Sequence, residues 1–393
     1  MILEHVISTA GALAAVASLP GTLELALLTA GAMLPRRTRI QSGKPLQRIA
    51  VIVPAHNEEH SIARTIQCLS ACERFEELAT LYVVADNCTD GTALVASDLR
   101  ALVIVRHDDS KRGKGYALQH ALSLLLPLDF AGFLIVDADT TAEPNLIVEV
   151  CGAFADGLQA LQCPYLVSNP GDSSSTRLMA LALRGFNFVR PRGRGRLGLS
   201  SGILGNGFAL SREVVQRVPY TAHSVVEDLE YHIELQRAGV NVHFLETTGV
   251  FGIMPAGGQG RATQRARWEG GRLRVLRDRW QWLFSRALRG EWRFAEVLGD
   301  LLLLPLAFHI LLILAAAAIP YSRLAGLAGL FTLAIHLAVI IGAGHTPGRD
   351  LRTLLQAPAY VIWKLALLPR TIAASAKSAS WVRTARSQEE SAA

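Results

Sequence analysis

Two aspartates, Asp137 and Asp139, flank a single alanine directly after a short apolar run. Side chains with this spacing reach a common point only where the backbone turns. Magnesium and manganese sites often use one or two carboxylates together with phosphate oxygens of a substrate. The pair therefore indicates a metal-assisted phosphate site, but a motif this short is also common in ordinary loops. Its weight depends on the residues that the fold brings beside it.

Other polar groups follow apolar runs in the same way. His-Asn-Glu at 56–58 and Asp-Asn at 86–87 each come directly after such a run. Four runs read as buried parallel strands: 49–53, 81–84, 102–105 and 133–136. Helical patterns lie between them at 62–69, 92–99 and 116–126, an alternation typical of α/β domains. Because ligands of open α/β sheets bind at the carboxyl ends of the strands, we expect these polar groups to share one edge.

Two later segments could also do chemistry. Lys111–Gly115 (KRGKG) offers cations and flexible backbone to a nucleotide or phosphate, and a solvated turn is the alternative. It is not a P-loop, because the required glycine and lysine spacing is missing. Glu227 and Asp228 open a predicted helix over 229–238 that ends at Gly239. Acidic residues at a helix start can simply cap it, whereas a general base would take a proton from a hydroxyl.

The composition indicates membrane segments. Half of the 393 residues are hydrophobic and 18% are charged, which excludes a disordered chain and a small disulfide scaffold. Apolar stretches at 6–35, 301–319 and 324–348 are each about long enough to span a bilayer. The basic residues of 36–44 follow the first stretch and none precedes it, so we expect the N-terminus outside and residues 36–293 in the cytosol. Five cysteines show no metal-ligand spacing and fit reduced thiols.

Basic residues are concentrated late in the chain. The net charge is +6, and residues 261–293 alone hold ten arginines against three acidic residues. Within them, 272–289 has apolar residues at helical spacing opposite arginines, which predicts a helix lying on anionic lipid or, alternatively, a solvated basic helix. Residues 351–370 and the tail around Trp381 and Arg383 are similar. No base-reading motif accompanies the arginines, so nucleic acid is not an expected partner.

Six motifs in order resemble one family. They are VIVPAHNEE (51–59), ADNCTDGT (85–92), RGKG (112–115), DAD (137–139), ED (227–228) and QRARW (264–268). Together they are similar to glycosyltransferase family 2, specifically the membrane-embedded cellulose, hyaluronan and chitin-oligosaccharide synthases. The resemblance covers about residues 46–300. It implies a GT-A fold, a UDP-sugar donor, Mg²⁺ or Mn²⁺, and inversion at the anomeric carbon.

The resemblance assigns the nucleotide side of the site. Pro54, His56 and Glu58 are expected to line the uridine pocket. Asp86 is expected to hold the uracil or the ribose, and Lys114 to support the nucleotide.

The resemblance also assigns the reacting side. Asp137 and Asp139 fall on the metal-binding DxD motif, with Asp139 as the more direct ligand, and Asp228 falls on the catalytic base. Three residues form QxxRW, two for the diphosphate and one for the acceptor sugar: Gln264, Arg267 and Trp268. A fixed guanidinium suits a diphosphate, and an indole face suits a sugar ring.

The chain departs from the processive synthases in places. Val226 stands where they commonly have threonine, and two C-terminal spans are fewer than the large synthases have. The segment Arg190–Arg196 (RPRGRGR) could meet a phosphorylated or lipid-linked acceptor, or be a flexible surface loop. The expected organisation is a membrane segment (1–35), a GT-A domain (46–260), an interfacial segment (261–293), two spans (294–348) and a tail (349–393).

We therefore expect a multi-pass inner-membrane enzyme with a cytosolic catalytic domain. It would extend a polysaccharide or a lipid-linked glycan, with an export partner for a long product. Transfer of one sugar to a polyprenyl-phosphate or lipid-linked acceptor is the alternative. A non-catalytic nucleotide-binding subunit or a transporter element fits less well, because Asp139, Asp228 and Arg267 are all retained.

Overall fold

A computed structural model describes residues 2–36, 43–255 and 258–376. Its main sheet has seven strands in the order β3-β2-β1-β4-β8-β6-β9. Their bounds are β1 Ile49–Ala55, β2 Ala79–Asp86, β3 Leu102–Arg106, β4 Gly132–Ile135, β6 Ala160–Gln162, β8 Phe208–Ser211 and β9 Val242–Phe244. The four strands expected from the sequence are confirmed, and they are parallel to one another. The expected burial is wrong for β3, which lies at the edge of the sheet and exposes Leu102 and Val105. The sheet as a whole is mixed, because β8 runs antiparallel to β4 and to β6.

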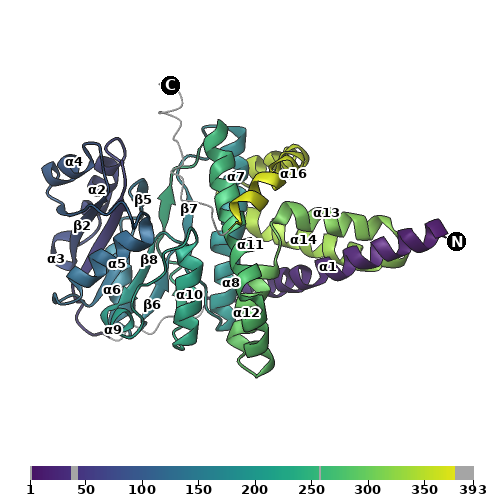
Figure 1. The fold of residues 1–393 in the computed structure, drawn as a ribbon, viewed down its shortest axis with the longest axis horizontal. Coiled ribbons are helices and arrows are strands. Elements are labelled where there is room, and N and C mark those ends of the chain that lie inside the picture. Colours follow the sequence, from purple (N-terminus) through teal and green to yellow (C-terminus); the bar gives the residue numbers. More distant parts are fainter. Residues whose placement is uncertain (1, 37–42, 256–257, 377–393) are drawn as a thin grey trace.

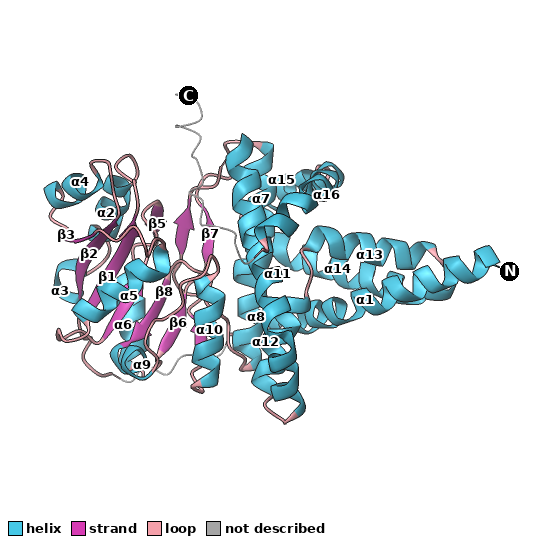
Figure 2. Ribbon diagram, in the orientation of Figure 1, coloured by secondary structure: helices cyan, strands magenta, loops and turns pink. Residues whose placement is uncertain are grey.

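Helices cover both faces of this sheet (Figure 2). One face packs α2 Ile62–Ser70, α3 Phe75–Leu78, α4 Thr92–Asp98 and α6 Leu146–Ala155. The other packs α5 Lys114–Leu125, α9 Arg212–Arg217 and α10 Glu227–Arg237. Val51 and Val53 of β1 point to the first layer and Ala50 and Ile52 to the second, all fully buried. Burial on both sides explains why β1 is apolar throughout instead of alternating.

A smaller sheet continues from the Asp137–Asp139 turn. It consists of β5 Thr140–Ala142, β10 Val250–Gly252 and β7 Tyr165–Val167. The central strand β10 is antiparallel to β5 and parallel to β7.

The remaining helices form the other half of the molecule. Their bounds are α1 Ile2–Met33, α7 Ser174–Arg184, η1 Gly185–Val189, α8 Arg190–Leu197, α11 Gly258–Leu288, α12 Trp292–Leu302, α13 Leu306–Ala318, η2 Pro320–Ser322, α14 Arg323–Gly342, α15 Pro347–Leu354 and α16 Ala357–Ala374. Figure 1 shows α1, α13 and α14 extending away from the sheets as an elongated bundle, with α8, α11 and α12 between the bundle and the sheets. His309 and His336 each contact a threonine of α1, as expected of packing residues.

Two of the three expected spans are long helices. Both α1 and α14 are long and apolar enough to cross a membrane, and α1 continues through Pro20 as one helix. The stretch 301–319 is not one helix, which corrects the prediction. Helices α12 and α13 meet there at 81°, and together they could form a third, broken span. The backbone becomes extended at Leu303, where α12 ends, and Pro305 favours the break because it lacks a backbone N–H and disfavours a helical conformation of the residue before it.

Other expectations about helices also change. The segment Arg190–Arg196 is not a loop, because it forms most of α8, which continues from η1. The interfacial stretch 272–289 belongs almost entirely to the much longer α11. Residues 351–370 divide between α15 and α16, and Pro369 lies inside α16. Arg37, Arg39, Trp381 and Arg383 lie outside the described residues.

Candidate active site

One cavity of about 1250 Å³ opens at the carboxyl ends of β1, β2 and β4 and continues toward the apolar helices α1, α13 and α14. Every site residue expected from the sequence lines it: Pro54, His56, Glu58, Asp86, Lys114, Asp137, Asp139, Asp228, Gln264, Arg267 and Trp268. These residues come from six separate segments of the chain. The fold therefore brings the expected set together, while the role of each remains a prediction.

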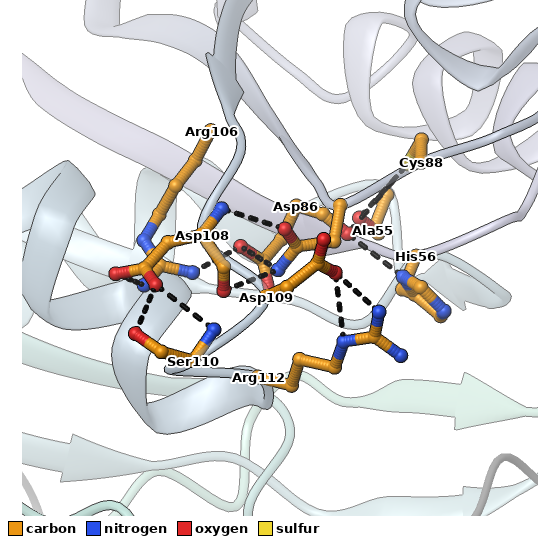
Figure 3. Close-up of polar contacts among 10 residues, drawn as sticks. Ala55, His56, Asp86, Cys88, Arg106, Asp108, Asp109, Ser110 and Arg112 are labelled. Carbon is orange, nitrogen blue, oxygen red and sulfur yellow. Dashed lines mark hydrogen bonds and ion pairs between the residues drawn. The ribbon is translucent and has the colours of Figure 1, made fainter.

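The expected nucleotide residue Asp86 forms an ion pair with Arg106, a residue that lies outside the sequence motifs. Asp86 ends β2 and is 5% exposed, and Arg106 lies directly opposite it at the end of β3. Arg106 Nη1 donates to Asp86 Oδ1 at 2.5 Å, and its Nη2 donates to Asp108 (Figure 3). Asn87 Nδ2 also donates to Asp86 Oδ1, at 3.2 Å. In the sequence, the only indication of this contact is that Arg106 directly follows the apolar run 102–105.

His56 is held by the backbone of the neighbouring strand. Its Nδ1 lies 2.8 Å from the carbonyl oxygen of Asp86 (Figure 3). A carbonyl oxygen only accepts, so Nδ1 carries the proton in this contact. Pro54 and Glu58 flank His56, and the Glu58 carboxylate accepts a hydrogen bond of 2.6 Å from Ser61. This loop is therefore shaped by its own polar contacts before any nucleotide binds.

The motif at 85–92 forms hydrogen bonds with the motif at 51–59. Thr92 accepts a hydrogen bond from the Glu58 backbone N–H at 2.7 Å, and Asp90 accepts one from the Glu59 backbone at 3.1 Å. Asn57, at φ +55, exchanges hydrogen bonds with Thr89. These residues link the β1 and β2 loops, so the segment 89–92 shapes the pocket wall through its neighbours.

Lys114 begins α5 and faces the aspartate pair. Its Nζ donates to the Asp137 carboxylate and to the Gly205 carbonyl. Burial disfavours the Lys114 ammonium, but the Asp137, Glu227 and Asp228 carboxylates outweigh burial and raise the pKa of Lys114. The lysine is therefore a fixed cation inside the cavity, which excludes the solvated turn for this residue.

The turn that carries Asp137 and Asp139 is clamped by a residue that sequence reasoning missed. Asn206 is fully buried, accepts from the Asp137 backbone N–H at 3.0 Å and donates to Thr140 at 2.8 Å. No group of three or more His, Cys, Asp or Glu side chains in the described part of the chain could hold a metal alone. Asp137 and Asp139 fit the kind of site in which substrate phosphates supply further ligands.

Glu227 and Asp228 begin α10 beside Lys114. The helix N-cap is Val226, and Asp228 Oδ1 accepts a hydrogen bond of 2.8 Å from the adjacent Leu229 N–H. Burial, reinforced by the Asp228 charge, raises the pKa of Glu227 to about 7. Burial also raises the pKa of Asp228 above its usual range. Gly205 lies against this carboxylate at φ +80, where a side chain would be strained.

Two adjacent glycines, Gly270 and Gly271, allow helix α11 to pack closely against its neighbours. A Cβ on Gly270 would lie 2.7 Å from the Thr371 carbonyl of α16, and a Cβ on Gly271 would lie 2.3 Å from a methyl group of Val226. Val226 is 7% exposed, so its departure from the family pattern serves packing between α10 and α11. The close approach places Gln264, Arg267 and Trp268 of α11 at the cavity.

The QxxRW residues have distinct surroundings. Burial lowers the pKa of Arg267, against the raising effect of Glu227 and Asp137, so its guanidinium faces the acidic groups of the site. Trp268 packs beside Met179, Leu183 and Met254 and still reaches the cavity.

Further along the cavity, four helices meet in a buried ion cluster. Asp300 of α12 accepts from Arg190 at 2.5 Å and from Arg194 at 2.8 Å, both on α8, and from Arg272 of α11 at 2.9 Å. Glu24 of α1 accepts from Arg194 at 2.7 Å. The basic segment Arg190–Arg196, for which the sequence left open an acceptor site or a surface loop, is thus largely neutralised inside the protein, because acidic residues distant in sequence pack against it.

Beyond the ion cluster the cavity wall is apolar. Its lining comes from α1, α13, α14 and the turn between α12 and α13: Leu25, Leu303, Leu306, Ile310, Leu337 and Ile340.

Comparison with known proteins identifies the family. The family model described as glycosyltransferase like family 2 matches residues 46–271, more than half of the chain. The chain belongs to this family. It is therefore a glycosyltransferase, an enzyme that transfers a sugar, with an α/β GT-A fold. The narrower resemblance to polysaccharide synthases goes beyond what the family match shows.

Individual relatives of this glycosyltransferase are distant. A probable glycosyltransferase, YdaM, of Bacillus subtilis is 24% identical over 242 residues, which are 59% of this chain and 57% of the relative. A beta-monoglucosyldiacylglycerol synthase of Synechocystis is 27% identical over 270 residues, which are 65% of this chain and 54% of the relative. The chain thus spans just over half the length of these two relatives.

A solved structure supports the fold. The mannosyltransferase PcManGT of Pyrobaculum calidifontis, determined with GDP-Man and Mn²⁺, has a TM-score of 0.55 at 17% identity. The match covers 94% of this chain and 97% of the mannosyltransferase. At this identity the likeness concerns the fold.

Proposed function

We propose that this glycosyltransferase moves a sugar from a UDP-sugar to a hydroxyl of a lipid-linked acceptor at a membrane surface, with inversion at the anomeric carbon. The observation that carries the proposal is the continuous cavity. It leads from Asp86 and the aspartate pair, past Asp228, to the apolar walls of α1, α13 and α14. A soluble sugar acceptor has no apolar surface to place against those walls, whereas the hydrocarbon chain of a lipid would bury its apolar surface there.

Asp228 is the proposed general base. Its raised pKa makes it a stronger base than an ordinary aspartate, and a half-buried position keeps competing water away. It would take the proton of the acceptor hydroxyl as that oxygen attacks the anomeric carbon and the bond to the nucleoside diphosphate breaks. Arg267 would stabilise the growing charge on the diphosphate, and Trp268 would stack on the acceptor.

Mg²⁺ or Mn²⁺ would be held by Asp139 and Asp137 together with donor phosphates. When bound, the metal would neutralise phosphate charge. Lys114 contributes a permanent cation beside Asp137, and its contact with the Gly205 carbonyl keeps the ammonium at this edge.

The membrane setting has separate support. Two helices are long enough to span, and α11 exposes Leu273, Trp280, Phe284 and Leu288 among arginines. The Synechocystis relative is named for a lipid-linked product, which agrees with a lipid acceptor. We place the chain in an inner membrane with the GT-A domain on the cytosolic side.

Chain extension of a polysaccharide is the second candidate, and the QxxRW motif favours it. The described helices supply at most three spans, fewer than we expect of a self-contained channel. A polymer-forming enzyme of this architecture would therefore need an export partner.

The decisive experiment measures nucleotide release from UDP-sugars and GDP-sugars by the full chain in lipid nanodiscs, with lipid acceptors and with Mg²⁺ or Mn²⁺. Asp228→Asn should abolish release while nucleotide affinity stays within about twofold, because Asp228 acts only on the acceptor proton. The matched control is Glu234→Gln, which removes a carboxylate from the outer part of the same helix. Turnover retained in Asp228→Asn would refute the assignment of the base, and a ladder of products would favour polymerisation.

A further inference from the structure

An unusual set of cations lies where α7, α11 and α16 meet (Figure 1). Arg261 and Arg265 are one helical turn apart on α11, and Lys364 of α16 forms an ion pair with Glu269. Within the described residues neither Arg261 nor Arg265 forms an ion pair with a carboxylate. Arg261 donates to the Ser175 hydroxyl, and Arg265 contacts the sulfur of Met179, a poor acceptor. The group thus carries two uncompensated positive charges.

These two arginines differ from other enclosed arginines of the protein. Arg106, Arg190 and Arg194 are each paired with aspartate. The Nε atoms of Arg261 and Arg265 are shielded from solvent and have no hydrogen-bond partner, and the same is true of Arg190 and Arg194. The difference is that, within the described residues, Arg261 and Arg265 have no carboxylate partner for the rest of the guanidinium. Placing cations away from water without a counterion is costly, so a protein retains them where an anion completes the site.

The surroundings indicate what kind of anion this is. The Arg261 guanidinium lies 4.2 Å from the centre of the Trp363 ring, and that of Arg265 lies 5.6 Å from the centre of the Trp268 ring. Around Trp363, the outer surface of α16 is apolar and exposed, as four residues show: Ile362, Leu365, Leu368 and Ile372. A guanidinium pair beside an apolar helix surface matches a molecule that has both a phosphate and hydrocarbon chains.

The site also communicates with the active-site cavity. Arg265, Tyr360 and Lys364 line that cavity, whereas Arg261 lies behind them toward α7. An anion between the two arginines would therefore sit beside the acceptor end of the cavity, on the same helix as Gln264, Arg267 and Trp268.

We propose that Arg261 and Arg265 bind the phosphate of a membrane lipid whose chains lie along α16. The inference rests on the proposed membrane setting and is independent of the sugar and of the catalytic base. The phosphate has two potential sources, a bilayer phospholipid or a phosphate-linked lipid acceptor. Binding of either lipid would stabilise the packing of α11 against α16. It would thereby help to hold the QxxRW residues of α11 in position at the cavity.

The test is native mass spectrometry of the full chain in detergent, carried out in the Asp228→Asn background so that binding is read without turnover. The probes are phosphatidylglycerol, a polyprenyl phosphate, diacylglycerol and inorganic phosphate. Arg261→Gln with Arg265→Gln should weaken binding of a lipid phosphate about 100-fold, from the loss of two charge-assisted hydrogen bonds. The matched control, Arg64→Gln with Arg217→Gln, removes the same charge from exposed positions of α2 and α9, away from the proposed membrane surface, and should change binding less than threefold.

Further arms separate the lipid sources and guard against misfolding. Tighter binding of phosphatidylglycerol identifies a bilayer lipid, and tighter binding of the polyprenyl phosphate identifies an acceptor. Arg261→Lys with Arg265→Lys keeps the charges and should retain most of the affinity, while unchanged nucleotide binding shows that the fold is intact. The proposal is overturned if diacylglycerol binds as tightly as the tighter-binding of the two phosphate-bearing lipids, if inorganic phosphate alone binds as well as that lipid, or if the control variant loses as much affinity.

Discussion

Replacing Arg106 by methionine would leave the Asp86 carboxylate buried without its guanidinium. The two side chains are 7% and 9% exposed and are joined by a bond of 2.5 Å. Breaking a buried ion pair by removing one partner costs about 3–5 kcal/mol of stability, because the remaining charge is uncompensated. We expect Arg106→Met to lie in this range, and the Michaelis constant for the donor to rise about tenfold or more as the carboxylate loses its orientation.

Asp86→Asn in the same chain should recover much of that stability, because the buried charge is removed with its partner. Thermal or denaturant unfolding of the wild type, both single variants and the double variant gives the coupling energy. Arg112→Met is the control, since the Arg112–Asp109 pair is 61% and 80% exposed and should not affect unfolding measurably. A coupling energy below about 0.5 kcal/mol would show that Arg106 and Asp86 act independently and would refute the reasoning.

Three further predictions concern the reacting side. Gly271→Ala should lower the turnover number at least tenfold in the nucleotide-release assay, because its Cβ would lie 2.3 Å from a methyl group of Val226. Adding Val226→Ala should restore activity, and the control Gly342→Ala should be neutral because there is open space around Gly342. Activity should fall as the pH drops through about 7, because protonation of the coupled pair Glu227 and Asp228 removes the base. Glu227→Gln should move this acidic limb of the pH–rate profile to lower pH, because it removes a like charge beside Asp228. An acidic limb that does not move would contradict this prediction. Chelation of divalent ions should abolish sugar release, and added Mn²⁺ or Mg²⁺ should restore it, whereas full activity in chelator would exclude the proposed role of Asp137 and Asp139.

The local pattern of the chain was sufficient for the first half of the sheet. Strands at 49–53, 81–84, 102–105 and 133–136 are apolar runs bounded by polar turns, and β1, β2, β3 and β4 form there. Strands β6, β8 and β9 escaped prediction because they have three or four residues each, too few to show a period. The break at Pro305 was visible in the sequence, but hydropathy averaged over a window does not register it.

The sequence by itself indicated the family and the expected site residues through the resemblance of its six ordered motifs. It also determined the polar edge of the sheet, because strand ends are local features that side-chain period reveals. Only the tertiary structure decided which charges are neutralised. Arg190 meets Asp300 across 110 positions of sequence, while Arg265 meets no carboxylate within the part of the chain that the structure describes. No local pattern distinguishes these arginines, because the partner of a buried charge depends on which helix packs beside it. That packing separates the structural arginines of α8 from the two on α11 to which we assign a ligand.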